Sequence, residues 1–143
     1  METQEIADRL EITGLLARYT HAIDSGRWDL LDDVFSPDAV IDYTSSGGIR
    51  GTRDDVKAWL ADVLAHWPAR LHLVGAAYID FQDGEARVSA PFTDTLAPTR
   101  EMVAVGTEGF LHGGGWYHHR MRRTPDGWRS TELVEEQSWR TAR

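Results

Sequence analysis

Apolar residues near the start of the chain recur at helical spacing. Between residues 6 and 23 an apolar side chain stands at every third or fourth position, which predicts one long helix with a single buried face. Gly26 is a natural end for this helix, and the apolar residues of 28–35 predict a second, shorter one. Thr52 can cap a third helix, which is expected to close at Trp67–Pro68.

From residue 70 onward the pattern changes to the two-residue alternation of β-strands. Asp83–Gly84 is a strong signal for a hairpin turn between two such segments. Gly113–Gly114–Gly115 interrupts a long third segment and predicts a bulge or bend there. The expected strands cover residues 39–43, 70–81, 85–96, 101–124 and 128–139.

Helices followed by antiparallel strands are typical of an α+β domain whose sheet packs on its helices. We therefore expect residues 1–143 to form a single domain, with three N-terminal helices packed in a strongly curved antiparallel sheet. A chain of 143 residues can bury a sizeable core without the help of metals or disulfides.

Composition narrows the functional classes. The absence of cysteine excludes a disulfide framework, thiol catalysis and thiolate metal sites, and it is compatible with a reducing cytoplasm. A net charge of −8 argues against nucleic acid as a partner, because binding to phosphates requires a clustered basic face. No apolar run approaches the roughly 20 residues that cross a bilayer, so we expect a cytoplasmic protein without membrane contact.

Tyr19, Asp24 and His72 form the most informative set of polar residues. Tyr19 and Asp24 end the first predicted helix, and His72 enters a predicted strand. A carboxylate that holds an imidazole in one tautomer, with a phenol nearby, is the minimal set for moving a proton on a small organic molecule. The alternatives are that Asp24 only caps the following helix or is exposed, and that His72 is a surface or core residue.

The segment after the glycine run offers two faces of one strand. Tyr117, His119 and Arg123 share a face whose mixture of apolar bulk, imidazole and guanidinium suits an oxygenated substrate. Arg123 could instead pair with Glu132 across the last hairpin. The opposite face carries Trp116, which suits a subunit interface. The predicted substrate-binding residues are Trp28, Tyr43, Tyr117, His119 and Arg123.

Neither a metal nor an organic cofactor is expected. His118 and His119 are adjacent and point to opposite faces of a strand, and His112 lies in a glycine-rich loop, so the histidines lack the spacing of a zinc site. The sequence also lacks the glycine-rich phosphate-binding motifs and the G-x-S-x-G motif of serine hydrolases.

Two motifs resemble the SnoaL-like branch of the NTF2-like superfamily, and the resemblance covers nearly the whole chain. One is Y-x-x-x-x-D-x-x-x-W-D-x-L-x-x-x-F-x-x-D-A-x-x-D, which begins at Tyr19, and the other is G-x-Y-x-x-x-x-x-R-T-x-D-G-W-R, which ends at Arg129. The resemblance implies a cone-shaped fold in which His72 is a general base and Asp24 orients it. Tyr19 falls where a related steroid dehydratase has a tyrosine and a related dehydrochlorinase has a lysine. Arg123 matches an arginine that lines the dehydrochlorinase pocket.

The resemblance also implies a function. We expect a cofactor-independent lyase of dehydratase type, which removes a proton beside a carbonyl of a small cyclic or polyketide-like substrate. An isomerase or a polyketide cyclase with the same pair is an alternative, and so is a non-catalytic small-molecule-binding protein. The resemblance further implies a homo-oligomer, either a dimer or a trimer, formed through the outer face of the sheet.

Overall fold

Helices occupy the first part of the chain and long strands the second. The structure is a computed structural model, and it describes residues 1–99 and 109–142. The first part of the strand expected over 101–124 falls outside those residues. In chain order the elements are α1 (Thr3–Ser25), the 3₁₀-helix η1 (Trp28–Asp33), β1 (Phe35–Asp42), the 3₁₀-helix η2 (Thr44–Ser46), β2 (Arg50–Thr52), α2 (Arg53–Leu64), β3 (Ala69–Val74), β4 (Tyr78–Gln82), β5 (Glu85–Ala97), β6 (Leu111–Thr124) and β7 (Gly127–Ala142).

The three expected helical segments are present, although the second differs in type. α1 ends where Gly26 adopts the left-handed conformation, with a φ of 70°, and the Gly26 N–H donates to carbonyl oxygens of the last turn. α2 begins with a reciprocal capping box between Thr52 and Asp55. The second segment is the 3₁₀-helix η1, and it is shorter than predicted because Phe35 already belongs to strand β1.

The strands form one mixed sheet in the order β2-β1-β7-β6-β5-β3, with β4 also paired to β5. The α+β class is confirmed, but the prediction of an antiparallel sheet is wrong at one place, since β1 and β7 run parallel. Parallel neighbours need a long connection, and the chain from β2 to β6 supplies it. The alternation within a strand carries no information about a partner so distant in the sequence.

The alternation over residues 70–81 belongs to two strands rather than one. β3 and β4 both pair with β5, and the ladder is interrupted opposite Pro91. Proline has no backbone N–H to donate, so a central strand cannot stay fully paired at this position. The Gly75 N–H instead donates to the Pro91 carbonyl at 2.7 Å. The hairpin at Asp83–Gly84 is confirmed, with φ values of 51° and 78° at its two residues.

The glycine run is confirmed as a bulge in the sheet. The pairing of β6 with β7 shifts register between Gly114 and Gly115. A Cβ atom on Gly115 would lie 1.8 Å from the Glu136 carbonyl oxygen. Only glycine therefore allows β7 to approach β6 this closely.

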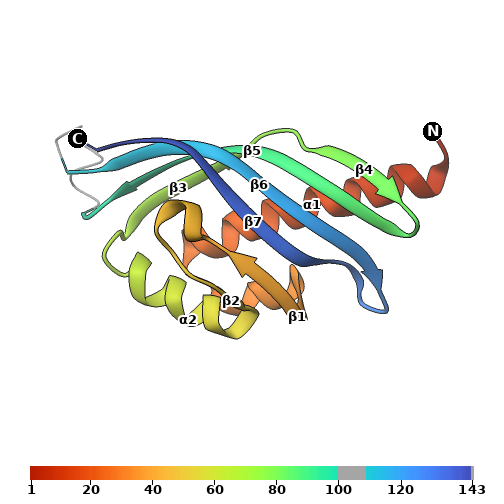
Figure 1. Ribbon diagram of the computed structural model, residues 1–143, viewed down its shortest axis with the longest axis horizontal. Coiled ribbons are helices and arrows are strands. Elements are labelled where there is room, and N and C mark those ends of the chain that lie inside the picture. Colours follow the sequence, from red (N-terminus) through yellow and green to blue (C-terminus); the bar gives the residue numbers. More distant parts are fainter. Residues whose placement is uncertain (100–108, 143) are drawn as a thin grey trace.

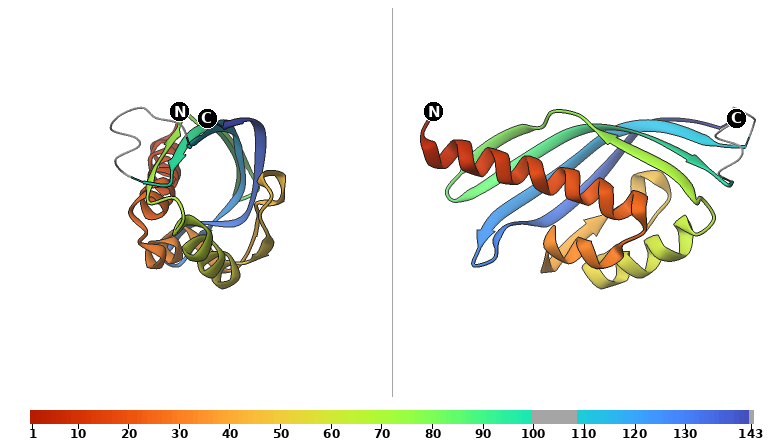
Figure 2. Two further views of the ribbon diagram at one scale, coloured as in Figure 1. Left: turned by 90° about the vertical axis from the view of Figure 1, so that its left-hand side faces the viewer. Right: turned by 180° about the vertical axis from the view of Figure 1, so that it is seen from behind.

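The sheet is strongly curved, and α1 and α2 cover its concave side (Figures 1 and 2). Two apolar clusters fill the interior between the sheet and the helices. The first cluster packs the middle of α1 against the sheet and includes Ile12 and Trp128. The second cluster lies toward the C-terminal half of α1 and includes Tyr19 and Tyr117.

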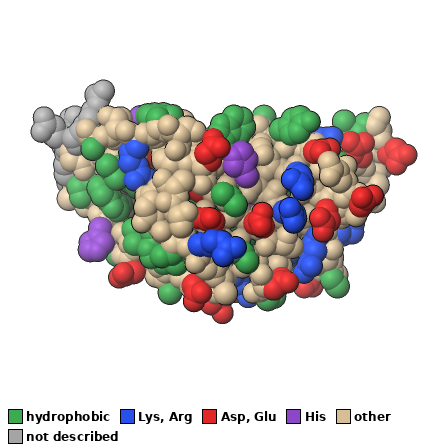
Figure 3. Space-filling view, in the orientation of Figure 1, with side chains coloured by type: hydrophobic (Ala, Val, Ile, Leu, Met, Phe, Trp, Pro, Cys, Tyr) green, Lys and Arg blue, Asp and Glu red, His purple; other side chains and the backbone are tan. Residues whose placement is uncertain are grey.

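Charged side chains of both signs are interspersed on the face of the molecule shown in Figure 3. Trp116 and Trp139 keep 38% and 45% of their surface exposed, at outward positions of β6 and β7. Among residues 1–99 and 109–142, no helix has the length and apolar character needed to span a membrane.

Candidate functional site

Asp24 and His72 lie together, hydrogen-bonded at two points. Asp24 Oδ1 lies 2.6 Å from His72 Nδ1, and Asp24 Oδ2 accepts a hydrogen bond of 2.8 Å from the His72 backbone N–H. Asp24 belongs to the last turn of α1 and His72 to β3, so the pair joins the two elements. A carboxylate at a helix C-terminus is disfavoured by the helix dipole, and the two donors of His72 compensate for this cost.

Asp24 also decides which ring nitrogen of His72 is left for a ligand. An ionised carboxylate can only accept hydrogen bonds, so Nδ1 of the neutral imidazole carries the hydrogen. The Nε2 atom then has an open lone pair that can accept a proton. The His72 side chain lines a cavity and keeps 9% of its surface exposed.

A second carboxylate, Asp94, lies on the other side of the imidazole. Its Oδ2 atom is 3.6 Å from His72 Nε2, which is an ion-pair distance rather than a hydrogen bond. His72 and Asp94 are direct partners in the β3–β5 ladder, which sets this arrangement. Asp94 was not predicted as a site residue, although it continues the inward-facing series of Ala90 and Phe92. The described residues, 1–99 and 109–142, contain no cluster of three or more His, Cys, Asp or Glu side chains that could hold a metal ion.

These groups line a cavity of about 280 Å³. Small-molecule sites usually measure about 300–1,000 Å³, so the cavity suits a small ligand. One wall is apolar and includes Trp59 of α2 and Trp67 of the segment that follows it. The polar groups of the lining include Tyr19, Tyr43, His72, Asp94, Tyr117 and Glu135.

Three buried tyrosines form a cluster beside the cavity. The hydroxyl groups of Tyr19 and Tyr43 are hydrogen-bonded to each other. The Tyr117 ring meets the edge of Tyr19 at a centroid distance of 5.2 Å and stacks on Phe92 at 4.1 Å. Burial raises the pKa of all three phenols, so they stay neutral near pH 7. One hydroxyl of the Tyr19–Tyr43 pair donates to the other, which leaves the hydrogen of the second hydroxyl, and that of Tyr117, for a ligand.

Glu135 and Arg140 of β7 also line the cavity, and neither was predicted as a site residue. Glu135 lies opposite Tyr117 in the β6–β7 ladder, so both side chains point to the same side of the sheet. Burial raises the pKa of the Glu135 carboxyl, and its Oε1 atom is buried without a hydrogen-bond partner. The signal in the sequence was the alternation of β7, which turns Glu135 inward together with Leu133.

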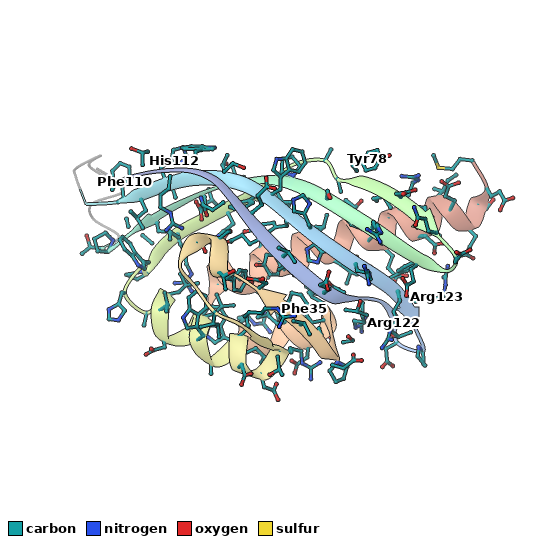
Figure 4. All side chains as sticks on the ribbon, viewed as in Figure 1. Phe35, Tyr78, Phe110, His112, Arg122 and Arg123 are labelled. Atoms are coloured by element: carbon teal, nitrogen blue, oxygen red, sulfur yellow. The ribbon has the colours of Figure 1, made fainter. Side chains whose placement is uncertain are left out.

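Arg123 lies away from the cavity. It stands near the turn between β6 and β7, at the opposite end of β6 from His112 (Figure 4). Its guanidinium donates to Asp8 Oδ2 at 2.8 Å, so the alternative pairing with Glu132 is wrong. The alternation along β6 predicts on which face of the sheet a side chain lies, but not how far along the strand it lies from the site.

Trp28 and His119 also lie outside the cavity lining. Trp28 packs under the Arg70 guanidinium, at 5.7 Å, and this arginine donates to carbonyl oxygens at the ends of α1 and α2. His119 is buried next to Phe35, with Nδ1 2.8 Å from Ser130 Oγ. Burial lowers the pKa of His119 to about 3, so its ring is neutral at pH 7.

Comparisons with known proteins agree with this geometry at the level of fold and family. The chain is 41% identical over 137 residues to the uncharacterized protein Rv2910c of Mycobacterium tuberculosis, covering 94% of this chain and 88% of that one. A Novosphingobium aromaticivorans protein described as a candidate scytalone dehydratase superimposes with a TM-score of 0.84 at 17% identity, covering 100% and 92% of the two chains. The hexachlorocyclohexane dehydrochlorinase LinA type 2 superimposes with a TM-score of 0.81 at 14% identity, covering 97% and 90%. Residues 4–134 match the sequence profile of the SnoaL-like domain, and the chain therefore belongs to the SnoaL-like family.

Proposed function

We propose that the protein is a cofactor-independent dehydratase that acts on a small cyclic carbonyl compound bearing a hydroxyl group. The observation that carries the proposal is the Asp24–His72 pair, which leaves the Nε2 atom of a cavity-lining imidazole for the substrate. The SnoaL-like family includes dehydratases and isomerases. Both reactions can begin with removal of a proton from the carbon beside a carbonyl group.

His72 is the base in this proposal. Its Nε2 atom removes the proton, and Asp24 stabilises the imidazolium that forms. Asp94 places a second carboxylate 3.6 Å from the same nitrogen, which further stabilises the positive ring. General base catalysis of this kind contributes about 10²–10⁴-fold to a rate.

The buried phenols supply hydrogen bonds to the substrate. As the proton leaves carbon, negative charge moves onto the carbonyl oxygen, where fixed donors stabilise it most strongly. Tyr19 and Tyr43 keep their protons because burial raises the pKa of both groups, and both line the cavity. Since one hydroxyl donates to the other, the pair offers one hydrogen to the substrate. The flat apolar side chains of Trp59 and Trp67 favour a ring as the substrate body.

The test compares two histidine variants on a panel of hydroxylated cyclic ketones, with mass spectrometry to detect loss of water. His72→Ala is expected to lower kcat/KM by about 10²–10⁴-fold. His118→Ala is the matched control, because His118 also lies on a strand near a carboxylate, Glu136 at 3.5 Å, but keeps 41% of its side chain exposed. Wild-type turnover by purified His72→Ala would overturn the mechanism. A product of unchanged mass would indicate an isomerase, and binding without turnover by the wild type would indicate a binding protein.

A further inference from the structure

Glu135 carries a largely buried carboxyl group that has no part in the steps above. It lines the cavity from β7, and its Oε1 atom is buried without a hydrogen-bond partner. A carboxyl oxygen in this position costs stability, because in the unfolded chain water would solvate it. Because the Glu135 side chain lines the cavity and this oxygen has no partner within the described protein, the carboxyl group is not held entirely by internal hydrogen bonds.

Charged and polar groups from several elements act on Glu135. Burial raises the pKa of this carboxyl, the nearby Ser46 hydroxyl lowers it, and the Asp94 carboxylate raises it. The Arg140 guanidinium lowers it, the His72 ring lowers it only when that ring is protonated, and the net direction is upward. The protonated acid is therefore present at higher pH than for an exposed glutamate. The phenols near enough to interact with the charge of Glu135 are those of Tyr19, Tyr43 and Tyr117.

We propose that Glu135 is the general acid of the dehydration and gives its carboxyl proton to the leaving hydroxyl group. This inference rests on the proposed function and adds a substrate class to it, a β-hydroxy carbonyl compound. Hydroxide is a poor leaving group, so the C–O bond breaks readily only when its oxygen is protonated as it departs. The neighbouring phenols are much weaker acids than a carboxyl group, which makes Glu135 the better donor.

The step balances without any further reactant. His72 Nε2 takes the proton from the α-carbon, and the electron pair of that C–H bond becomes the new C=C bond. The C–O bond to the β-carbon breaks with its electron pair, and the Glu135 proton converts the departing hydroxyl group into water. The products are an unsaturated carbonyl compound, an imidazolium and a carboxylate. Transfer of one proton from His72 to Glu135 through water in the cavity restores the starting state.

A comparison of leaving groups tests the acid role. Glu135→Gln keeps the size of the side chain but cannot act as an acid. Wild type and variant are assayed on β-hydroxycyclohexanone and β-acetoxycyclohexanone, which give the same conjugated enone, detected by its ultraviolet absorbance. Acetate leaves without protonation. The variant is therefore expected to lose about 10²–10⁴-fold on the hydroxy substrate and to stay within about threefold of wild type on the acetoxy substrate.

Two further variants distinguish a failure of the acid role from a failure of the proposed function. Glu136→Gln is the matched control, because Glu136 is the next residue of β7 and its side chain is exposed, and both activities should be unchanged. His72→Ala should lose both activities, because both need the base. Equal losses on the two substrates in Glu135→Gln, or undiminished dehydration, would overturn the acid role. If the wild type neither eliminates nor exchanges the α-proton with deuterated water, the proposed function fails and the acid role with it.

Infrared difference spectroscopy on the folded protein gives a readout that does not depend on turnover. An ordinary glutamate loses its proton near pH 4.3. In the wild type and in Glu136→Gln, part of the C=O absorption band of protonated carboxyl groups is expected to persist above that pH. This persisting part belongs to Glu135 and should be absent in Glu135→Gln. Loss of that band at the ordinary pH in the wild type would overturn the proposal, whatever the kinetics show.

Discussion

A carboxyl group that is largely removed from water lies toward each end of the curved sheet, and the surroundings of the two groups are opposite. At the end where α1 begins, Asp8 accepts hydrogen bonds from Gln4, Trp128 and Arg123. Burial alone would raise the pKa of Asp8, but the three donors together outweigh it, and the pKa is lowered. At the end where α1 finishes, Glu135 keeps one oxygen without a partner, and its pKa is raised.

The difference in hydrogen-bond partners indicates that Asp8 stabilises one end of the sheet, whereas Glu135 belongs to the candidate site at the other end. Asp8 fixes the first turns of α1 to β6 and β7, and Trp128 belongs to the first apolar cluster. Around Glu135 a cavity takes the place of a permanent hydrogen-bond donor. Proteins commonly give up stability at functional sites in this way, so the same kind of side chain can mark either role. The hydrogen-bond partners of a carboxyl group, rather than its burial, distinguish a structural role from a functional one.

The largest effect is expected on kcat, from a substitution of Asp24 at the end of the sheet that holds the cavity. In Asp24→Asn the amide can present an N–H to His72 Nδ1, which favours the wrong tautomer of the imidazole. The fall in kcat should be about 10³–10⁴-fold, as expected when the orienting carboxylate of a catalytic histidine is replaced. The fold should persist, because the amide oxygen can still accept from the His72 backbone N–H. Steady-state kinetics and circular dichroism check both points, and an unchanged kcat would remove Asp24 from the mechanism.

Removing the charge of Asp8 should have the opposite result, a loss of stability with little change in activity. Asp8→Asn is expected to lower the free energy of unfolding by about 2–3 kcal/mol, because hydrogen bonds to a charged acceptor are lost, and to leave kcat within about twofold. Glu5→Gln, one turn earlier in α1, is the control, since its partly exposed pair with Arg9 is worth only about 0.3–0.5 kcal/mol. Urea unfolding measures both variants.

The pH dependence of the Asp8→Asn effect has a defined sign. The folded-state pKa of Asp8 is lowered, so its contribution to stability is fully present above the unfolded pKa of about 3.9. That contribution is lost as the pH falls through the folded-state value. Wild type and Asp8→Asn should therefore converge in stability in acid, and a difference that stays constant down to pH 2 would contradict the role given to the charge.

Glu135→Gln should stabilise the protein, by about 1 kcal/mol near pH 8, because it removes a buried carboxylate with an unpartnered oxygen. The folded-state pKa is raised, so the wild type loses stability as the pH rises from the unfolded pKa, about 4.3, through the folded-state value. The gain should therefore vanish below about pH 4. Thermal melts across this range give the comparison, with Glu136→Gln as control. A variant that is less stable at pH 8 would show that Glu135 has a structural role like that of Asp8.

The smallest effect is expected at His119. Its pKa of about 3 implies that the ring takes up no proton between pH 5 and 8, so its imidazole NMR signals should not move in that range. His119→Gln identifies the signals by their disappearance. The neutral ring contributes stability that is full above the unfolded pKa of about 6.5 and is lost as the pH falls toward 3. A titration midpoint near 6.5 would mean that water reaches the ring.

Local patterns predicted most of the elements, and partners distant in the sequence account for the errors. Gly26 and Thr52 mark the ends of helices through contacts within a few residues, so they were identifiable from the sequence. The division of 70–81 into two strands depends on Pro91 in a neighbouring strand. The parallel pairing of β1 with β7 depends on a segment that lies most of the chain away. Neither feature leaves a trace in the alternation of the strand concerned.

The residues of the candidate site also differ in how far the sequence could predict them. Asp24 and His72 could be paired through the resemblance to a family, and the structure places them in contact. Asp94 and Glu135 had a readable signal, since a charged residue in an otherwise apolar inward series is costly unless it has a partner or a function. Arg123 gave a similar signal, but its partner was a residue of α1 at the far end of the sheet.

The parallel pairing of β1 with β7 has a consequence for how the protein is made. Ile41 pairs with Leu133, so the sheet cannot close until almost the whole chain has left the ribosome. Until then the edge of β1 that faces β7 is unpaired beside an open apolar interior, the kind of surface that chaperones bind. β7 also carries Glu135 into the cavity. The nascent chain therefore completes its candidate site in the same event that closes its sheet, and no earlier intermediate of synthesis holds the full set of groups.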